Sequence, residues 1–283
     1  MSSLSAAIEA GARRLAASGI DDARREARLL LAEATGLNSA AIIAHPERVL
    51  TDDRAARLEA LLRRREAREP LSRILGWREF WSLRFALGPE TLDPRPDSET
   101  LIEAALAAVD RNAALSVLDL GTGTGCLLLA FLSEAPKARG LGIDLSNAAL
   151  AVAQANALSL GLGGRARFRQ GDWGRGLVER FDLILCNPPY IPASAIESLD
   201  PEVAIFDPLL ALSGGKDGLD AYRRLSDELT RLLAPGGLAV VEIGAGQAEA
   251  ATAILVAHGL EPRGSRADLA GITRCLLLGA PAL

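Results

Sequence analysis

The stretch SVLDLGTGTG, residues 116–125, joins a short apolar strand to a glycine-rich turn, and an apolar helix follows from about Cys126. Glycine lets the backbone approach a ligand closely and adopt positive φ angles. The dinucleotide fingerprint G-x-G-x-x-G would need glycine at position 126, so the spacing here is G-x-G-x-G, preceded by Asp119. A carboxylate repels a phosphate and attracts a cation. The loop therefore favours S-adenosylmethionine, which carries a sulfonium and an ammonium and no phosphate, over a dinucleotide.

Strands and helices alternate from residue 97 onward. This alternation predicts an open, mostly parallel α/β sheet, in which ligands bind at the carboxyl ends of the strands. The expected strands are residues 116–120, 141–144, 166–170, 181–186, 238–243 and 274–278. Four helices are expected: one that begins near residue 126, one at 148–160, one at 221–233 and a last one that ends at 258. A Pro-Gly-Gly turn at 235–237 precedes the fifth strand.

Acidic side chains end two of these strands. Asp144 ends the second strand, where a carboxylate can accept both hydroxyls of a ribose. Asp144 could instead cap the next helix, although Ser146 or Asn147 is better placed to do so. Asp172 and Trp173 follow the third strand, where an acid can accept an adenine amino hydrogen and an indole can cover the ring. The alternative for Trp173 is a place in the apolar core.

The fourth strand ends in Asn187-Pro188-Pro189-Tyr190. Prolines lack N–H groups, so this turn presents carbonyl oxygens and few donors. The Asn187 side-chain carbonyl and the Pro188 backbone carbonyl can accept both hydrogens of one –NH₂ group, while Tyr190 packs against the plane that bears it. Such a site suits methyl transfer to a carboxamide or an exocyclic base amine, with the rate gained by alignment of the reacting atoms. A purely structural proline turn is the alternative.

The first seventy residues read as helices. The third helix carries Arg63, Arg64, Arg65 and Arg68, which we interpret as a solvated face, with a binding patch as the alternative. Residues 71–96 contain four clustered aromatic side chains and short alternating stretches, which predict a β-hairpin or an irregular linker between two domains. The stiff Pro94-Arg95-Pro96 corner would aim Arg95 in a fixed direction.

Composition excludes several classes of protein. The 283 residues carry 31 Lys and Arg against 36 Asp and Glu, a net charge of −5, which argues against general nucleic-acid binding. The three cysteines lie far apart and His45 and His258 are the only histidines, so we expect no zinc cluster, no disulfide scaffold and no bound metal. No run approaches 18 apolar residues and the N-terminus lacks a basic leader, so we expect a cytoplasmic protein.

Taken together, these motifs resemble those of the release-factor glutamine methyltransferases (PrmC/HemK). NPPY alone is shared with adenine-N6 DNA methyltransferases, whereas the stretches around it are more specific. The resemblance covers essentially the whole chain. The matching stretches are Arg78–Leu83, Pro94–Glu99, Asp119–Gly125, Gly171–Trp173, Asn187–Tyr190, Phe206–Pro208, Gly214–Tyr222 and Asp268–Gly271. One departure is Asp93, where the family pattern predicts an apolar residue.

The resemblance implies a Rossmann-like class I S-adenosylmethionine-dependent methyltransferase with a seven-stranded mixed sheet. It implies a helical-bundle docking domain at residues 1–73, a β-hairpin linker at 74–96 and a catalytic domain at 97–283. The expected substrate is the Gly-Gly-Gln glutamine of class-1 peptide chain release factors, methylated at N5 to modulate translation termination, with S-adenosyl-L-homocysteine as the product. We expect a monomer that contacts neither DNA nor a membrane.

The candidate site residues combine both lines of reasoning. The expected cofactor contacts are Asp119, Gly121, Thr122, Gly123, Thr124, Gly125, Asp144, Asp172, Trp173 and Asn187. The expected catalytic and substrate-binding residues are Asn187, Pro188, Pro189 and Tyr190, with Arg95 as a further substrate contact. Two alternatives stay open: an adenine-N6 methyltransferase, which would need a basic channel and a recognition insert, and a non-catalytic adaptor that binds release factors or ribosomes through its helices.

Overall fold

The structure is a computed structural model that describes residues 2–280. Its contacts divide the chain into two compact units. Unit 1 is Met1–Gly76 together with Asp200–Phe206, and unit 2 is Trp77–Leu199 together with Asp207–Leu283. The aromatic hairpin therefore belongs by its contacts to unit 2.

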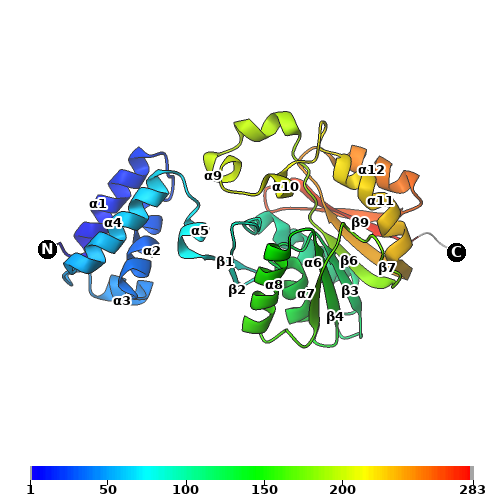
Figure 1. Ribbon diagram of the computed structural model, residues 1–283, viewed down its shortest axis with the longest axis horizontal. Helices are drawn as coiled ribbons and strands as arrows, with labels where there is room; N and C mark the ends of the chain where they lie inside the picture. The colour runs from blue at the N-terminus through cyan, green and yellow to red at the C-terminus, as the bar shows by residue number, and fades with distance from the viewer. Residues whose placement is uncertain (1, 281–283) are drawn as a thin grey trace. The chain divides into compact units, whose positions relative to one another are not determined.

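Unit 1 is a bundle of helices around an aliphatic core (Figure 1). The helices of the bundle are α1 (Leu4–Ala17), α2 (Ala23–Thr35), α3 (Ser39–Ala44), α4 (Asp52–Glu66) and α5 (Leu71–Leu75). The distant segment of unit 1 adds α9 (Pro201–Ala204), which contributes no side chain to this core. Leu15, Leu30 and Leu31 are completely buried at its centre. Glycine at position 36 takes a left-handed φ of 69° and ends α2.

The expected solvated arginine face of α4 is only partly exposed. Arg65 is 6% exposed, and its guanidinium lies 2.6 Å from Glu26 and 2.9 Å from Glu202. Arg68 also pairs with Glu202, at 2.7 Å. The interpretation of these arginines as a solvated face was therefore wrong for Arg65. Spacing along a helix could not show that a carboxylate more than a hundred residues away would cover it.

Residues 77–86 form a hairpin, which confirms the first of the two predictions for this region. β1 (Trp77–Phe80) pairs antiparallel with β2 (Leu83–Ala86). The turn residues Trp81 and Ser82 have φ values of 54° and 56°, as a two-residue type I′ turn requires. Glu99 holds this turn by accepting the Trp81 backbone N–H at 2.7 Å. The unexpected Asp93 is 4% exposed and lies 3.6 Å from Arg78 of the hairpin, so an ion pair occupies this position in place of an apolar contact.

A seven-stranded mixed sheet forms the centre of unit 2, as predicted, in the order β5-β4-β3-β6-β7-β9-β8. The strands are β3 (Ser116–Leu120), β4 (Arg139–Asp144), β5 (Ala166–Gln170), β6 (Phe181–Cys186), β7 (Leu233–Glu242), β8 (Glu261–Ala267) and β9 (Thr273–Gly279). The first five run parallel, and β9 is antiparallel to both of its neighbours. The Pro-Gly-Gly segment expected as a turn before β7 lies inside it, where the pairing with β6 shifts register.

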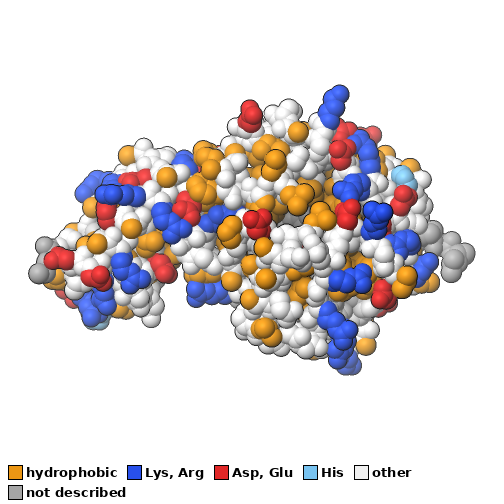
Figure 2. All heavy atoms as spheres, in the orientation of Figure 1, with side chains coloured by type: hydrophobic (Ala, Val, Ile, Leu, Met, Phe, Trp, Pro, Cys, Tyr) orange, Lys and Arg blue, Asp and Glu red, His pale blue; other side chains and the backbone are white. Residues whose placement is uncertain are grey.

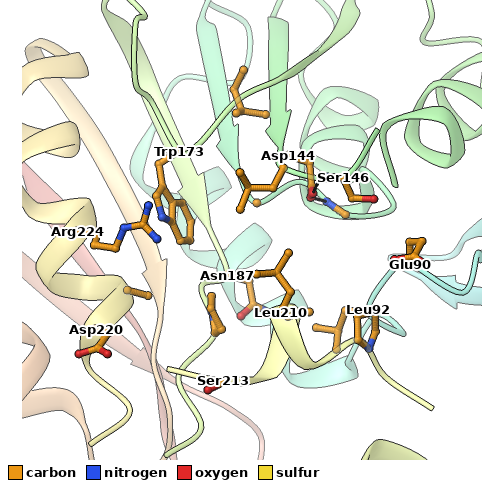
Figure 3. A pocket seen from close by; sticks show the side chains of 18 of the residues that line it. Glu90, Leu92, Asp144, Ser146, Trp173, Asn187, Leu210, Ser213, Asp220 and Arg224 are labelled. Carbon is orange, nitrogen blue, oxygen red and sulfur yellow. Dashed lines mark hydrogen bonds between the residues drawn. The ribbon is translucent and has the colours of Figure 1, made fainter. Parts of the chain in front are cut away.

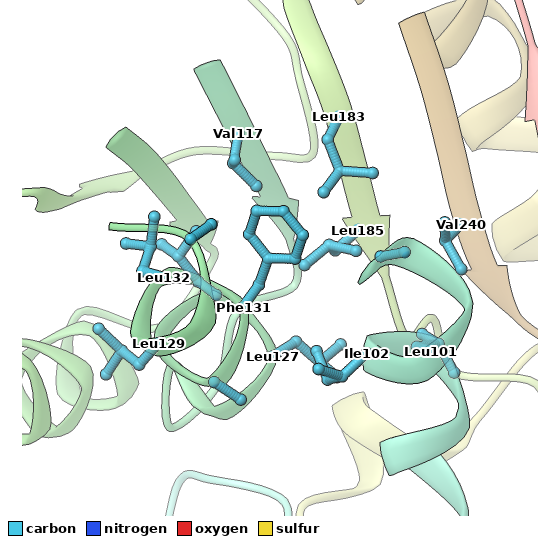
Figure 4. Close-up of a cluster of buried hydrophobic side chains, with 14 of the residues drawn as sticks. Leu101, Ile102, Val117, Leu127, Leu129, Phe131, Leu132, Leu183, Leu185 and Val240 are labelled. Atoms are coloured by element: carbon cyan, nitrogen blue, oxygen red, sulfur yellow. The ribbon is translucent and has the colours of Figure 1, made fainter. Parts of the chain in front are cut away.

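Helices cover both faces of this sheet (Figure 1). α6 (Glu99–Ala108), α7 (Cys126–Glu134) and α8 (Asn147–Ser159) follow η1 (Pro96–Ser98) and pack on one face. Figure 4 shows this core, in which Phe131 of α7 lies against Val117, Leu183 and Leu185 of the strands. α11 (Asp220–Leu232) and α12 (Ala248–Ala257) cover the other face, and η2 (Ala193–Ser198) and α10 (Leu209–Leu212) lie in the long β6–α11 connection.

The topology places the predicted motifs together. The chain passes from β3 outward to β4 and β5, then returns to the opposite side of β3 with β6 and β7. Adjacent strands therefore end in the glycine loop and in the Asn187 motif, at the point where the strand order reverses. Open α/β sheets bind their ligands at such a point.

Two surface properties bear on the sequence-based expectations. Within residues 2–280, no helix is both long enough and apolar enough to cross a membrane. On the face shown in Figure 2, Lys and Arg side chains are interspersed with Asp and Glu.

Candidate active site

A cavity of about 410 Å³ opens at the carboxyl ends of β3 to β6 (Figure 3). Its wall includes six of the predicted site residues: Gly121, Gly123, Asp144, Trp173, Asn187 and Pro189. The opposite wall comes from the β6–α11 connection and from the segment after the hairpin. The cavity lies wholly within unit 2.

The glycine loop needs glycine for conformation and for space. Gly121, Gly123 and Gly125 have φ values of 75°, 53° and 80°. A Cβ at position 121 would stand 3.6 Å from the Trp173 ring, so the glycine loop and the indole lie next to each other in the wall of the cavity. The loop is held down because the Gly123 N–H donates to Asp144 Oδ2 at 2.8 Å.

Asp119 lies beneath this loop and is completely buried. Thr122 donates to its Oδ2 at 2.6 Å, whereas Oδ1 has no hydrogen-bond partner among the described residues. Burial, with a smaller contribution from the nearby Asp144, outweighs the hydrogen bond from Thr122 and raises the pKa of this carboxyl from 3.8 to about 7. An uncompensated buried carboxylate fits a cationic ligand above it and does not fit a phosphate.

Asp144 has both carboxyl oxygens engaged by backbone donors, with Ser146 N–H at 2.9 Å from Oδ1. Ser146 caps α8 by accepting the Ala149 N–H at 3.2 Å, which confirms that Asp144 is not the cap. The carboxylate lines the cavity, and its role toward a ribose stays a prediction.

Trp173 takes a left-handed φ of 52°, which is uncommon for a residue other than glycine and costs energy. Its side chain lines the cavity beside Arg224, and its buried Nε1 has no partner among the described residues (Figure 3). Asp172 points elsewhere: Arg224 Nη2 donates to both of its oxygens, at 2.6 and 2.7 Å. The structure thus offers Trp173 to a ligand directly, whereas Asp172 fixes Arg224.

Asn187 lines the cavity with its amide orientation set by a neighbour. Its Nδ2 donates to Ser98 Oγ at 3.1 Å. The side-chain oxygen is therefore the atom left to accept hydrogens from a ligand. Sequence reasoning placed an acceptor here, and the structure supplies the partner that orients it.

Tyr190 is fixed at two points. Its hydroxyl donates to Glu242 Oε1 at 3.2 Å, and its backbone carbonyl accepts from Gln247 Nε2 at 2.9 Å. Burial and the adjacent carboxylate raise the pKa of Tyr190 above its ordinary value, so the hydroxyl stays protonated. Gln247 is itself held, because its Oε1 accepts from Tyr222 at 3.1 Å.

Arg95 and several loop residues lie outside the lining of the cavity. Arg95 donates to the buried Asp207 at 2.5 Å, immediately before Pro208, which does line it. The predicted site residues that do not line the cavity are Asp119, Thr122, Thr124, Gly125, Asp172, Pro188, Tyr190 and Arg95. Their roles as ligand contacts stay predictions.

Sequence reasoning missed Ser98, Glu242, Gln247 and Arg224. A signal existed for Glu242, because a carboxylate inside the apolar run LAVVEIG is rarely buried without a purpose. Ser98 lies within the Pro94–Glu99 stretch but had no assigned role. The sequence pattern gives no sign that Ser98 or Glu242 lies beside the Asn187 motif.

Comparisons with known proteins agree with this geometry. Residues 6–76 match the PrmC N-terminal domain family, and residues 111–257 match a methyltransferase domain family. The release factor glutamine methyltransferase of Rhodospirillum rubrum is 50% identical over 95% of this chain and 83% of its own length. The enzyme of that name from Cereibacter sphaeroides is 48% identical over 98% of each chain.

A solved structure supports the fold alone. The crystal structure of a methyltransferase from Pyrococcus furiosus superposes with a TM-score of 0.54 at 16% identity, covering 71% of this chain and 90% of that chain. The sequence relatives are far closer and span both family matches. This chain therefore belongs to the release factor glutamine methyltransferase family.

Proposed function

We propose that this chain transfers a methyl group from S-adenosyl-L-methionine to the N5 amide nitrogen of the glutamine in the Gly-Gly-Gln motif of class-1 peptide chain release factors. Modulation of translation termination would follow from this modification. The observation that carries the proposal is the oriented amide of Asn187: its nitrogen is committed to Ser98, so its oxygen faces the cavity as an acceptor. Membership of the family supports the choice of substrate.

The cofactor residues follow from the cavity wall. When bound, S-adenosyl-L-methionine supplies an electrophilic methyl group. Gly121 and Gly123 allow a close backbone approach, Trp173 offers an aromatic face, and Asp144 offers a carboxylate to a ribose. The buried charge of Asp119 favours a cationic ligand over the loop, since opposite charges stabilise one another strongly where water is excluded.

The Asn187 motif would bind the substrate amide through hydrogen bonds. An –NH₂ group has two hydrogens, which the Asn187 side-chain oxygen and the Pro188 carbonyl accept together. Holding both N–H bonds aims the nitrogen lone pair in the remaining direction and favours its pyramidal, reactive form. Most of the rate gain would come from alignment at about 3–3.5 Å between reacting atoms. The N-methylated amide is acidic immediately after transfer and loses its proton readily, so no strong base is required.

The decisive experiment incubates the protein with labelled cofactor and a purified class-1 release factor, then locates the added methyl by mass spectrometry. The proposal expects one methyl on the Gly-Gly-Gln glutamine. A release factor with that glutamine replaced by alanine is the matched control and should take no label. Labelling of duplex DNA in a parallel reaction, with none on the factor, would favour the adenine-N6 alternative instead.

We also propose that unit 1 contacts the release factor away from the glutamine. A tripeptide offers too little surface for selectivity, since stable protein interfaces bury about 1,200–2,000 Å². The whole factor should therefore be methylated far more efficiently than a short Gly-Gly-Gln peptide. Equal kcat/KM for the two substrates would refute this role.

A further inference from the structure

Asn156 of α8 is 1% exposed, and its side-chain amide joins the end of the hairpin to the glycine loop. Its Oδ1 accepts the Ala86 backbone N–H at 2.8 Å, and its Nδ2 donates to the Ala86 carbonyl at 3.1 Å. The Nδ2 group also donates to the Thr124 carbonyl at 2.9 Å. The oxygen and both hydrogens of the amide are therefore engaged, and a flipped amide would place its oxygen against two carbonyls.

We propose that Asn156 is a positioning residue for the cofactor. Its amide fixes the glycine loop relative to the segment after the hairpin and so sets the width of the cavity between them. Ala86, Thr124 and Asn156 do not line the cavity, so the amide acts on a ligand only through the backbone that it holds. The identity of that ligand, S-adenosyl-L-methionine, rests on the proposed function.

On one side of this link, the glycine loop packs directly on α8. A Cβ at Gly125 would stand 3.2 Å from Ala153 Cβ, which lies about one helical turn before Asn156. Thr124 is 2% exposed and precedes this glycine, while Gly123 on its other side lines the cavity. Glycine gives the loop little conformational preference of its own, so the hydrogen bond at the Thr124 carbonyl restricts where this backbone lies.

On the other side, the segment after β2 packs on the same helix. A Cβ at Gly88 would stand only 2.9 Å from the nearest side chain of α8. The buried Thr91 closes the next turn, because its Oγ1 accepts the Gly88 N–H at 3.1 Å and donates to the Gly88 carbonyl at 2.9 Å. Its neighbours Glu90 and Leu92 line the cavity, across from Trp173 in Figure 3. Since this turn is closed, its position follows that of the strand end that the α8 amide holds.

The two walls therefore share one buried anchor. Without the amide, the glycine loop and the closed turn can move relative to each other, and the cavity has the width that fits the cofactor for only part of the time. The apparent affinity falls in proportion to that fraction, since the ligand binds only the competent form. Because the amide is fully used by these two segments, we expect the Asn187 motif to bind the substrate amide as before.

Calorimetry and steady-state kinetics of the full chain test this role together. Asn156→Ala should weaken S-adenosyl-L-methionine binding by roughly tenfold, as expected if the cavity is competent about a tenth of the time. Its KM for the cofactor should rise by the same factor, whereas kcat at saturating cofactor and the KM for the release factor should stay at wild-type values.

Two control variants separate positioning from stability. Gln154→Ala, on the exposed side of α8, should bind the cofactor as the wild type does. Leu162→Ala truncates a buried side chain beyond the end of α8, and it should lower stability without weakening cofactor binding. Wild-type cofactor affinity in Asn156→Ala, or an equal loss of affinity in Leu162→Ala, would overturn the role.

Hydrogen exchange in the wild-type chain tests the link without any substitution. Bound S-adenosyl-L-homocysteine should slow exchange of the Ala86 N–H by roughly tenfold, although Ala86 lies outside the cavity wall. Exchange that slows in the glycine loop but not at Ala86 would show that the two walls move independently, and would overturn the inference. If the release factor is methylated while Asn156→Ala binds the cofactor normally, the inference alone fails. If cofactor binding depends on Asn156 as expected while the release factor takes no methyl, the inference stands and the proposed function fails.

Discussion

Replacing Asp119 by asparagine should make the stability of unit 2 less dependent on pH. The buried carboxyl has a pKa of about 7 in the folded chain against 3.8 as its ordinary value. The folded state therefore holds this proton more tightly than the unfolded chain does. The stability that Asp119 contributes is fully present below about pH 3.8 and is lost as the pH rises through about 7.

The size of the effect follows from the two pKa values. At about 1.4 kcal/mol per pKa unit, the penalty for ionising Asp119 grows from roughly 1 kcal/mol near pH 4.5 to roughly 4 kcal/mol near pH 8.5. Asparagine keeps the shape and cannot ionise. Relative to the wild type, Asp119→Asn should therefore gain roughly 3 kcal/mol between these two pH values. Any steric cost of the substitution cancels, because only the change with pH is compared.

Urea unfolding followed by tryptophan fluorescence measures this directly. All three tryptophans, Trp77, Trp81 and Trp173, lie in unit 2, so the signal reports on that unit. The exposed carboxyl variant Glu249→Gln is the control and should follow the wild type at both pH values. Parallel free energies of unfolding for wild type and Asp119→Asn would refute the assignment of a buried, uncompensated charge beneath the glycine loop.

Three further substitutions test the site and the helical unit. Asn187→Ala should lower turnover by roughly 10²–10³ with cofactor affinity little changed, as for loss of one positioned polar contact, and unchanged turnover would exclude these hydrogen bonds to the substrate amide. Gly121→Ala forces a side chain into a φ of 75° beside Trp173, so calorimetry should show weaker cofactor binding, by roughly tenfold, and unaltered affinity would contradict the close backbone approach. Arg65→Ala leaves the largely buried Glu26 without its partner, whereas Glu202 keeps its pair with Arg68; far-ultraviolet circular dichroism should report a loss of unfolding free energy of roughly 3–5 kcal/mol, and a loss below about 1 kcal/mol would show that the Arg65–Glu26 pair is solvated.

The strands that sequence reasoning predicted well are those whose patterns are set by burial. β3 and β6 match the expected residues at both ends, because apolar side chains bounded by polar turns leave few alternatives. β5 matches as well, since Ala166 and Phe168 alternate with the exposed Arg167 and Arg169. β8 was missed because its seven residues are almost entirely exposed and include Pro262 and Gly264. It is a strand only because β9 supplies its hydrogen-bond partners, and pairing of that kind is not encoded within the segment itself.

In the candidate site, too, some features were predictable from local sequence and others depend on residues far away along the chain. Motifs that follow a strand were predictable, because parallel strands bring their carboxyl ends to one edge. The groups that orient those motifs were not, since Ser98 lies 89 residues from Asn187 and Glu242 lies 52 residues from Tyr190. Local patterns carry no information about such pairs. Arg95 was predicted to contact the substrate, whereas in the structure it donates to Asp207. The rigid proline corner indicated that Arg95 has a fixed direction but did not indicate its partner.

The discontinuous make-up of unit 1 has a practical consequence for dissecting the protein. A truncation after Gly76 follows the limit of the matched N-terminal family but leaves Asp200–Phe206 behind. The shortened piece would keep Arg65 and Arg68 and lose Glu202, the acid that both of them share. Low stability of such an N-terminal fragment would then result from the loss of the Glu202 carboxylate, which another part of the chain supplies. Release-factor capture is better measured with the uncut polypeptide.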